Sequence, residues 1–372
     1  MRILSNSEYL SPTSGIAVQS VQVTEELVRR GHVLDIVYVH DGPFRARYES
    51  FANSLRQVPE LDANLRDMLR QAPRLASAVR TGARTHPDVV YANRARCLPW
   101  AVGVGTVARA PVVCHLHGIV GIETPFVNRW LGRLTSRYIC VSRYLRDRFV
   151  DLGGDPGRTE VVHNGIDPAD YPVGGTDERR RARSALGIEE DAQVVMYFGR
   201  IVPEKGVSVL TAALQSLVDR GVDVQLLIMG PQLDGEYGRD SLAACPNVRI
   251  HRLETNPDVV TPLHAADVVA VPSVDLEPFG RTVIEALSTG RPVVASAVGG
   301  IPEILTGDLS SLLVPSEDSG ALASKLEQLI GWRRTRPGLA RECTEHVARH
   351  FTKDQMTSAI EEILVHSVRR AG

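Results

Sequence analysis

The 372-residue sequence predicts an α/β protein with two doubly wound, Rossmann-like parallel-sheet domains. Three observations support this prediction. The chain is long for a single core and suits two domains of common size. Short apolar segments that are typical of buried strands alternate with helical segments of roughly 10–15 residues. A stretch rich in Pro, Gly and charged residues interrupts this alternation near residue 172.

The first predicted domain covers residues 1–172. It opens with the strand RILSNS, a helix that ends at Gly31 and the strand HVLDIVYV, which together make a parallel βαβ unit. Residues 44–84 are expected to be helical and polar. Four further strands are predicted, and they read DVVYAN, PVVCHLHG, RYICVS and TEVVHNG.

The second predicted domain covers residues 173–350. Its expected strands read QVVMYFG, VQLLIMG, NVRIH, DVVAVPS, PVVAS and SLLVP. A terminal helix is expected over about residues 351–372, and we expect it to pack back on the first domain. Two such domains leave a cleft, and ligands of these sheets bind at the carboxyl ends of the strands.

Composition favours an ordinary globular protein, with 43% hydrophobic and 23% charged residues. The apolar runs are shorter than the roughly 18–20 residues that span a bilayer, and the first residues do not resemble a signal peptide. The cysteines are scattered and form no C-x-x-C pair, which favours free thiols in a reducing cytoplasm. They are Cys97, Cys114, Cys140, Cys245 and Cys343.

A net charge of −2 conceals a difference between the two halves of the chain. Residues 1–172 contain 21 Arg and 17 acidic residues, a balance of +4, so the rest carries −6. A basic half is compatible with an acidic partner or a membrane surface, and equally with solvated charges. An apolar stripe from Phe44 to Val58, flanked by arginines, has the same two interpretations, an interfacial helix or a core-packing helix. We favour the core.

The stretch YFGRIVPEKG places two cations at the end of a predicted strand. Arg200 follows Gly199 directly, and Lys205 comes five residues after Arg200. Only two other lysines occur in the chain, at positions 325 and 353. Fixed cations at a strand end suit a diphosphate leaving group. A surface ion pair is the alternative interpretation.

The stretch EPFGRTVIE carries two carboxylates eight positions apart. Pro278 and Gly280 predict a loop, with a helix from about Arg281 to Ser288, so Glu277 lies outside the helix and Glu285 inside it. Backbone amides at a helix N-terminus, together with the helix dipole, favour an anion. A phosphate site between the two glutamates argues against a glycosidase-type pair. The stretch therefore indicates a clamp along an extended ligand.

With VVHNGID and GGIPEIL, these stretches resemble the GT-B-fold retaining glycosyltransferases of family 4, over nearly the whole chain. The resemblance implies that Glu277 holds the donor sugar and Glu285 the ribose, while Arg200 and Lys205 bind the diphosphate. It places His117 near the reacting carbon and the acceptor. It also implies that residues 1–172 form the acceptor-side domain and residues 173–350 the nucleotide-sugar-binding domain. Further donor-binding positions implied by the resemblance are Gly15, Asn164, Gly199, Arg252, Leu253, Phe279, Gly280, Arg281 and Thr282.

Some positions depart from the family pattern. Ser14 precedes Gly15 where two glycines are common, and Arg281 stands where an apolar residue is usual. His115 and His117 lie two apart on one strand and share a face, as metal ligands could. No third ligand and no D-x-D motif accompany them in the sequence, so we expect no metal site.

We therefore predict a cytoplasmic, retaining, metal-independent glycosyltransferase without a cofactor. Its donor is a nucleotide-diphospho-sugar linked to UDP or GDP, and its acceptor a hydroxylated small molecule such as a cyclitol or natural product. Transfer to a lipid-linked cell-envelope acceptor, with weak peripheral membrane contact, is the first alternative. A nucleotide-sugar epimerase or a non-catalytic nucleotide-sugar-binding protein is the second. No nucleic-acid partner is expected, and the sequence does not predict the oligomeric state.

Overall fold

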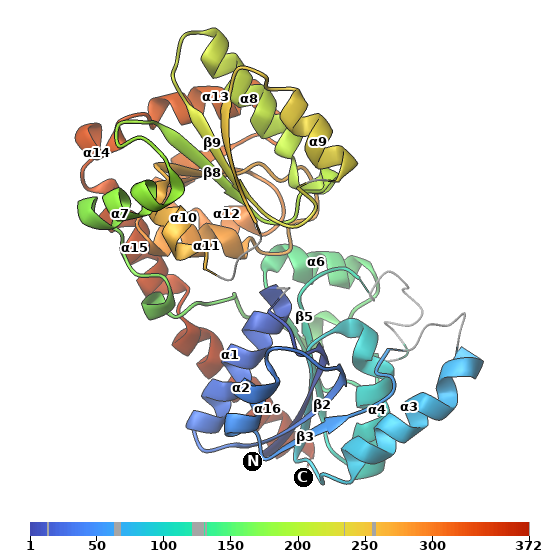
Figure 1. The fold of residues 1–372 in the computed structure, drawn as a ribbon. Helices are drawn as coiled ribbons and strands as arrows, with labels where there is room; N and C mark the ends of the chain where they lie inside the picture. The colour runs from blue at the N-terminus through green and yellow to red at the C-terminus, as the bar shows by residue number, and fades with distance from the viewer. Residues whose placement is uncertain are drawn as a thin grey trace. The chain divides into compact units, whose positions relative to one another are not determined.

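A computed structural model describes residues 1–12, 15–62, 68–120, 130, 132–233, 235–254 and 258–371, without the side chains of residues 68, 69 and 371. The chain divides into two compact units (Figure 1). Unit 1 contains Met1–Asn164 and Lys353–Gly372, and unit 2 contains Gly165–Thr352. Each unit is an α/β fold built on its own parallel sheet.

Unit 1 has a seven-stranded sheet in the order β3-β2-β1-β4-β5-β6-β7. The strands are β1 (Arg2–Tyr9), β2 (Val33–His40), β3 (Ser54–Gln57), β4 (Val89–Ala92), β5 (Val112–Leu116), β6 (Arg137–Cys140) and β7 (Thr159–Val161). The helices are α1 (Gly15–Arg29), α2 (Arg45–Phe51), α3 (Met68–Ala83), α4 (Leu98–Ala108), α6 (Arg143–Asp151) and α16 (Lys353–Ala371). Ile3 packs in the cluster beneath α1 and α16, whereas its neighbour Leu4 lies close to Gly82 of α3, so helices cover both faces.

The stripe from Phe44 to Val58 packs in the core. Tyr48 is 1% exposed and Val58 is 2% exposed. Phe44 and Phe51 pack against the same hydrophobic cluster. This part is only partly helical, because β3 pairs in parallel with β2 after α2 ends. The expectation of a helical segment over 44–84 was therefore wrong for β3, a short edge strand whose sequence alternates weakly.

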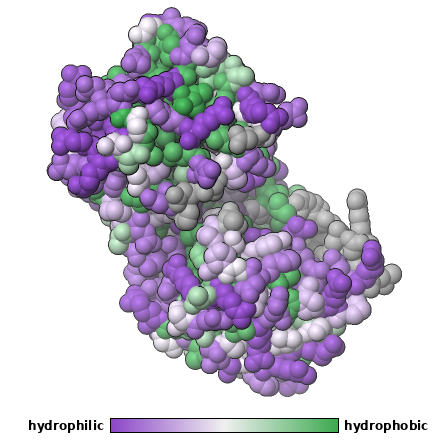
Figure 2. Space-filling model, in the orientation of Figure 1, coloured by the Kyte–Doolittle hydropathy of each residue, from purple (hydrophilic) through white to green (hydrophobic). Residues whose placement is uncertain are grey.

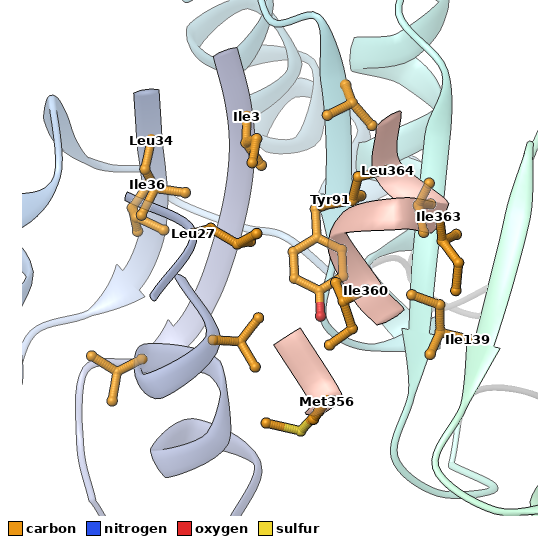
Figure 3. Packing of buried hydrophobic residues seen from close by; sticks show 14 of the residues in the cluster. Ile3, Leu27, Leu34, Ile36, Tyr91, Ile139, Met356, Ile360, Ile363 and Leu364 are labelled. Carbon is orange, nitrogen blue, oxygen red and sulfur yellow. The ribbon is translucent and has the colours of Figure 1, made fainter. Parts of the chain in front are cut away.

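The terminal helix α16 completes the core of unit 1. Met356, Ile360 and Leu364 from this helix lie against Tyr91 and Ile139 of the sheet (Figure 3). Polar contacts fix the same helix to α1.

Arg30 at the end of α1 forms ion pairs with Asp354 at 2.5 Å and with Glu361 at 2.8 Å. His32 also contacts Glu361, at 2.7 Å. The last residues of the chain are thus part of the first unit.

Unit 2 has a six-stranded sheet in the order β10-β9-β8-β11-β12-β13. The strands are β8 (Val194–Phe198), β9 (Gln225–Met229), β10 (Arg249–Leu253), β11 (Val268–Val271), β12 (Val293–Ser296) and β13 (Leu313–Val314). The helices are α7 (Thr176–Leu186), α8 (Val207–Asp219), α9 (Glu236–Ala243), α10 (Val260–Ala265), α11 (Arg281–Ser288), α12 (Ile301–Ile304), α13 (Ser319–Gln328), α14 (Trp332–Thr335) and α15 (Leu339–His350).

The structure places the change of unit after Asn164, earlier than the sequence-based boundary at residue 172. Tyr171 already contacts unit 2, because its hydroxyl donates to Glu285 at 2.9 Å and its carbonyl accepts from Ser288 at 3.2 Å. Tyr171 lies within the Pro- and Gly-rich stretch that set the predicted boundary. The second change of unit falls between Thr352 and Lys353.

Strand order reverses beside the first strand of each sheet. In unit 1, β1 pairs with β2 on one side and with β4 on the other. In unit 2, β8 pairs with β9 and with β11. The connecting helices leave in opposite directions at such a point, so the carboxyl ends of the two strands stay uncovered and form a natural ligand site.

The surface that Figure 2 shows is mostly hydrophilic, with smaller hydrophobic patches between the charged groups. Across the described parts of the chain, no helix combines the length and the apolar character needed to cross a bilayer.

Replacing Ile360 with Ala tests the docking of α16. Ile360 is fully buried between α1 and the sheet, so we expect Ile360→Ala to lower the free energy of unfolding by about 3 kcal/mol. Urea denaturation measures the change. Glu362→Ala on the exposed side of α16 serves as the control and should alter stability by less than about 0.5 kcal/mol. Equal effects of the two substitutions would show that α16 is not part of the core.

Candidate functional site

The carboxyl end of β8 forms one side of the candidate donor site in unit 2. Gly199 follows the strand with a φ of +143°, and its amide donates to the carbonyl of Met229 at 3.0 Å. The Tyr197 hydroxyl donates to the carbonyl of Arg200 at 2.5 Å. The Arg200 side chain is 60% exposed and lies 3.9 Å from Glu204, too loose a pair to fix its position.

Lys205 and Glu277 form an ion pair beyond the carboxyl ends of β8 and β11. Lys205 ends a short 3-10 turn, Pro203–Lys205, and its Nζ lies 2.5 Å from Oε2 of Glu277. Their side chains are 21% and 12% exposed. The Ser273 hydroxyl donates to the same carboxylate oxygen at 3.4 Å. The sequence predicted both residues in the site, but it did not predict that they pair with each other.

The segment Gly299-Gly300 holds the loop that carries Glu277. The amide of Gly300 donates to the Glu277 carbonyl at 2.8 Å. A Cβ at Gly299 would lie 1.9 Å from this carbonyl oxygen, and its φ is +58°. Only glycine fits there, which gives the GG of the GGIPE motif a structural role: it fixes the backbone of Glu277.

Gly280 precedes α11 in a left-handed conformation with a φ of +104°. A Cβ there would also lie 3.1 Å from Ile301, so backbone conformation and packing both favour glycine. Phe279 is 2% exposed, and its ring packs 5.9 Å from that of Phe351. Thr282 is half-buried in the first turn of α11. The predicted helix bounds, Arg281–Ser288, are confirmed.

Glu285 is held by two donors. Nε of Arg281 lies 2.6 Å from Oε1 of Glu285, and the Tyr171 hydroxyl donates to the same oxygen at 2.9 Å. Burial disfavours the charged form of Arg281, but Glu285 and Tyr171 outweigh it and raise the pKa of the guanidinium. Arg281 thus positions Glu285, a role that its location beside the predicted phosphate site did not reveal. Tyr171 was missed because it lies in the segment interpreted as a linker.

Arg252 and Leu253, the last residues of β10, line a cavity in unit 2. This cavity of about 390 Å³ is also lined by the loop that follows β9, Gly230 to Leu233. The resemblance assigned the backbone of Arg252 and Leu253 to the nucleotide base. In the structure the loop after β9 lines the same cavity as these two residues, and its Gln232 adopts a φ of +71°.

His117 lies directly after β5 in unit 1 as a half-buried residue with a buried Nε2, beside the buried side chains of His115 and Tyr91. The ring centroids of His115 and His117 are 4.1 Å apart, and Nδ1 of His115 lies 2.7 Å from the Tyr91 hydroxyl. Burial, assisted by the positive charge of Arg94, lowers the pKa of His117 to about 3. Burial also holds the pKa of His115 well below its usual range. Both imidazoles are therefore neutral at physiological pH.

Gly15 and Asn164 lie in other parts of unit 1. Gly15 is the exposed first residue of α1, and its neighbour Ser14 lies outside the described residues. Asn164 is 7% exposed, and its Oδ1 accepts from Nε2 of Gln19 at 2.6 Å. Asn164 therefore connects the end of the first segment to α1. Among the described residues, no group of three or more His, Cys, Asp or Glu side chains could hold a metal ion.

Two family models match the chain in succession. Residues 13–170 match Glycosyltransferase Family 4, and residues 192–331 match Glycosyl transferases group 1. A D-inositol 3-phosphate glycosyltransferase of Corynebacterium efficiens is 35% identical over 97% of this chain and 95% of its own length. A relative of the same name from Mycobacterium tuberculosis H37Ra is 34% identical over 59% of this chain and 45% of its own length.

Solved structures share the fold over the whole chain. HepE of Anabaena in complex with UDP-glucose has a TM-score of 0.82 and 26% identity, covering 98% of this chain and 100% of that one. Sucrose-phosphate synthase of Thermosynechococcus elongatus has a TM-score of 0.80 and 20% identity, with full coverage of both chains.

The two parallel-sheet units are those of a GT-B glycosyltransferase. The chain belongs to glycosyltransferase family 4. It is an enzyme that transfers glycosyl groups, which leaves no ground for the epimerase and non-catalytic alternatives.

The buried state of His117 predicts a pH dependence of stability. Its pKa in the folded chain is about 3, below the ordinary 6.5. Between these values the unfolded chain binds a proton that the folded chain does not, so stability falls as the pH is lowered through this window and is unaffected above it. His117→Asn should reduce the slope by up to about 1.4 kcal/mol per pH unit. Denaturation at several pH values between 7 and 4 measures the slope, with exposed His350→Asn as the control. An unchanged slope in His117→Asn would contradict the buried neutral imidazole.

Proposed function

We propose that this enzyme transfers a sugar from a UDP-linked donor, with retention of configuration and without a metal ion, to a hydroxyl of a small polyol such as a cyclitol. HepE, of similar fold at 26% identity, is described in complex with UDP-glucose, which supports the donor class. Relatives at about a third identity are named for D-inositol 3-phosphate, a phosphorylated cyclitol, which supports a cyclitol-type acceptor. The pair of Lys205 and Glu277 at the strand reversal of unit 2 carries the proposal.

Because Lys205 and Glu277 are paired, donor binding would exchange the partner of each residue for a group of the donor. In the free enzyme the ammonium and the carboxylate satisfy each other while they are largely removed from water. A donor supplies both replacements: its diphosphate takes the Lys205 ammonium, and its sugar hydroxyls donate to Glu277. Neither charge is then left buried alone, a state that would cost several kcal/mol.

Glu285 is prepared for a second part of the donor. Arg281 and Tyr171 both contact its Oε1, while Oε2 accepts no hydrogen bond from the described part of the chain. A fixed carboxylate with one open oxygen suits the ribose hydroxyls of a nucleotide. The spacing of Glu277 and Glu285 across the start of α11 then matches a donor laid along the helix N-terminus, with its phosphates between them.

The proposed reaction forms a bond from the acceptor oxygen to the anomeric carbon of the sugar. The bond from that carbon to the phosphate oxygen breaks on the same face, and the departing diphosphate takes the acceptor proton. Lys205 and the positive end of α11 stabilise the charge that develops on the leaving group, the task that a metal performs in other enzymes. His117 of unit 1, as a neutral imidazole, is suited to hydrogen-bond the donor sugar or the acceptor.

No observation favours the lipid-linked acceptor. The stripe from Phe44 to Val58, which would have served as an interfacial helix, packs in the core of unit 1. The small-molecule acceptor is therefore the candidate we retain.

Lys205→Ala tests the leaving-group role. We expect a fall in kcat of roughly 100- to 1,000-fold, as for removal of one preorganised donor, with the fold retained. Lys325→Ala is the matched control, because Lys325 lies on α13 of the same unit and bonds only to Gln328 in the described chain. Steady-state kinetics and circular dichroism measure the outcome. Similar rates for a folded Lys205→Ala enzyme and the control would contradict the assignment.

Nucleotide binding and product stereochemistry test the donor and the mechanism. UDP at 100 times its Kd should stabilise the enzyme by about 2.7 kcal/mol, measured as a thermal shift larger than that with ADP or GDP. With a UDP-α-linked sugar, the anomeric proton coupling of the product should show an α-linkage, and EDTA should leave the rate unchanged. A preference for another base would contradict the UDP-linked donor. A product with inverted configuration would contradict the retaining mechanism. Inhibition by EDTA would contradict a metal-independent reaction.

A further inference from the structure

A polar pocket lies at the strand reversal of unit 1, and its lining includes Ile16, the residue after Gly15. It is formed by the end of β1, the start of α1 and the residues after β4, and has a volume of about 100 Å³. This is room for several water molecules. Its lining includes Asn6, Glu8, Tyr9, Ser11, Asn93 and Arg94.

We propose that this pocket binds the acceptor and selects an uncharged polyhydroxylated ring, a free cyclitol or sugar, over its phosphate ester. The inference rests on the proposed function and specifies its acceptor.

The charges of the pocket are balanced. Glu8 and Arg94 are the charged residues in its described lining, and Nη1 of Arg94 forms an ion pair with Oε2 of Glu8. The two side chains are 25% and 30% exposed, so solvent screens them only partly. A phosphate could reach Arg94 only by facing the Glu8 carboxylate and displacing it. A neutral polyol leaves the pair intact, and its hydroxyls can donate to Glu8.

The amide groups of the pocket suit hydroxyl groups. Asn93 is 4% exposed and anchored, because its backbone amide donates to Oδ1 of Asn6 at 3.0 Å. Its side-chain amide donates to the hydroxyls of Ser5 and Ser20 at 2.9 and 3.0 Å and to the Asn6 carbonyl at 3.2 Å.

One polar side-chain atom of Asn6 and one of Asn93 remain available to a ligand. Nδ2 of Asn6 and Oδ1 of Asn93 form no hydrogen bond within the described chain and are open to solvent. They offer one donor and one acceptor. A hydroxyl group can satisfy both, whereas a phosphate dianion only accepts. A ligand hydroxyl that makes both hydrogen bonds is therefore favoured over a phosphate oxygen at this point.

Tyr9, which lines the pocket, and His117, which lies near it, both suit a sugar-like acceptor. Tyr9 lines it as a 47% exposed ring that stacks on His40 at 4.5 Å. Such a fixed aromatic surface can pack against the C–H groups of a carbohydrate ring. The charge of Arg94 acts on His117, so the pocket lies near the imidazole that the family resemblance assigns to the reacting centre.

The test compares matched acceptors with the wild-type enzyme and two variants. Transfer is measured from UDP-glucose to myo-inositol and D-inositol 3-phosphate, and to glucose and glucose 6-phosphate. The wild-type kcat/KM should be at least about tenfold higher for the neutral member of each pair. Glu8→Gln removes the carboxylate and frees Arg94, so the preference should move toward the phosphorylated member by about tenfold or more. Glu160→Gln on β7, whose carboxylate is 48% exposed, should leave the preference unchanged.

The outcomes separate this inference from the proposed function. Preferred use of the phosphorylated acceptors, or no change of preference in Glu8→Gln, overturns the acceptor assignment while donor use stands. Failure of the wild-type enzyme to bind UDP or to release it from UDP-glucose contradicts the proposed donor instead. If Glu8→Gln does not fold, Ser11→Ala and Asn6→Asp take its place. Asn6→Asp adds a negative charge and should lower kcat/KM for the phosphorylated members further.

Discussion

The reversal of strand order beside the first strand of each sheet is the constraint on which both sites depend. Double winding places α8, which follows β8, and α10, which precedes β11, on opposite faces of the sheet, and likewise α1 after β1 and α3 before β4. The carboxyl ends at these two places are therefore left without a covering helix. In unit 2 the reversal brings the residues after β8 next to those after β11, which is why Lys205 and Glu277 meet although they are 72 positions apart. In unit 1 it brings Glu8 next to Arg94.

Both places share a second property: their binding groups are paired with each other. Lys205 pairs with Glu277, Arg281 with Glu285, and Arg94 with Glu8. Charges at the uncovered end of a sheet are partly removed from water, and a partner offsets that cost. Ligand binding then becomes an exchange of partners, which favours a ligand able to satisfy both members of a pair. A donor that carries a diphosphate and hydroxyl groups does so in unit 2, whereas a phosphate group in unit 1 could bind only Arg94 and would face the Glu8 carboxylate.

The sequence predicted those features that depend on local pattern. The strands near the site, the helix from Arg281 to Ser288 and the placement of Glu277 outside it follow from apolar runs and from the positions of proline and glycine. The edge strand β3 could not be predicted, because four half-polar residues carry little signal without their neighbour β2. The role of Arg281 also needed the structure, because one partner, Tyr171, is 110 positions away. The pairing of Glu8 with Arg94 is equally long-range, since no local spacing connects β1 to the residues after β4.

The central claim is that the bound donor replaces Glu277 as the partner of Lys205 and replaces Lys205 as the partner of Glu277. A crystal structure of the enzyme with UDP and with an unreactive UDP-sugar analogue tests it most directly. The account predicts that Nζ of Lys205 leaves Glu277 and lies within hydrogen-bonding distance of the diphosphate in both complexes. With the analogue, Glu277 should accept hydrogen bonds from the sugar hydroxyls. A diphosphate bound elsewhere, with the pair of Lys205 and Glu277 still intact, would contradict the account.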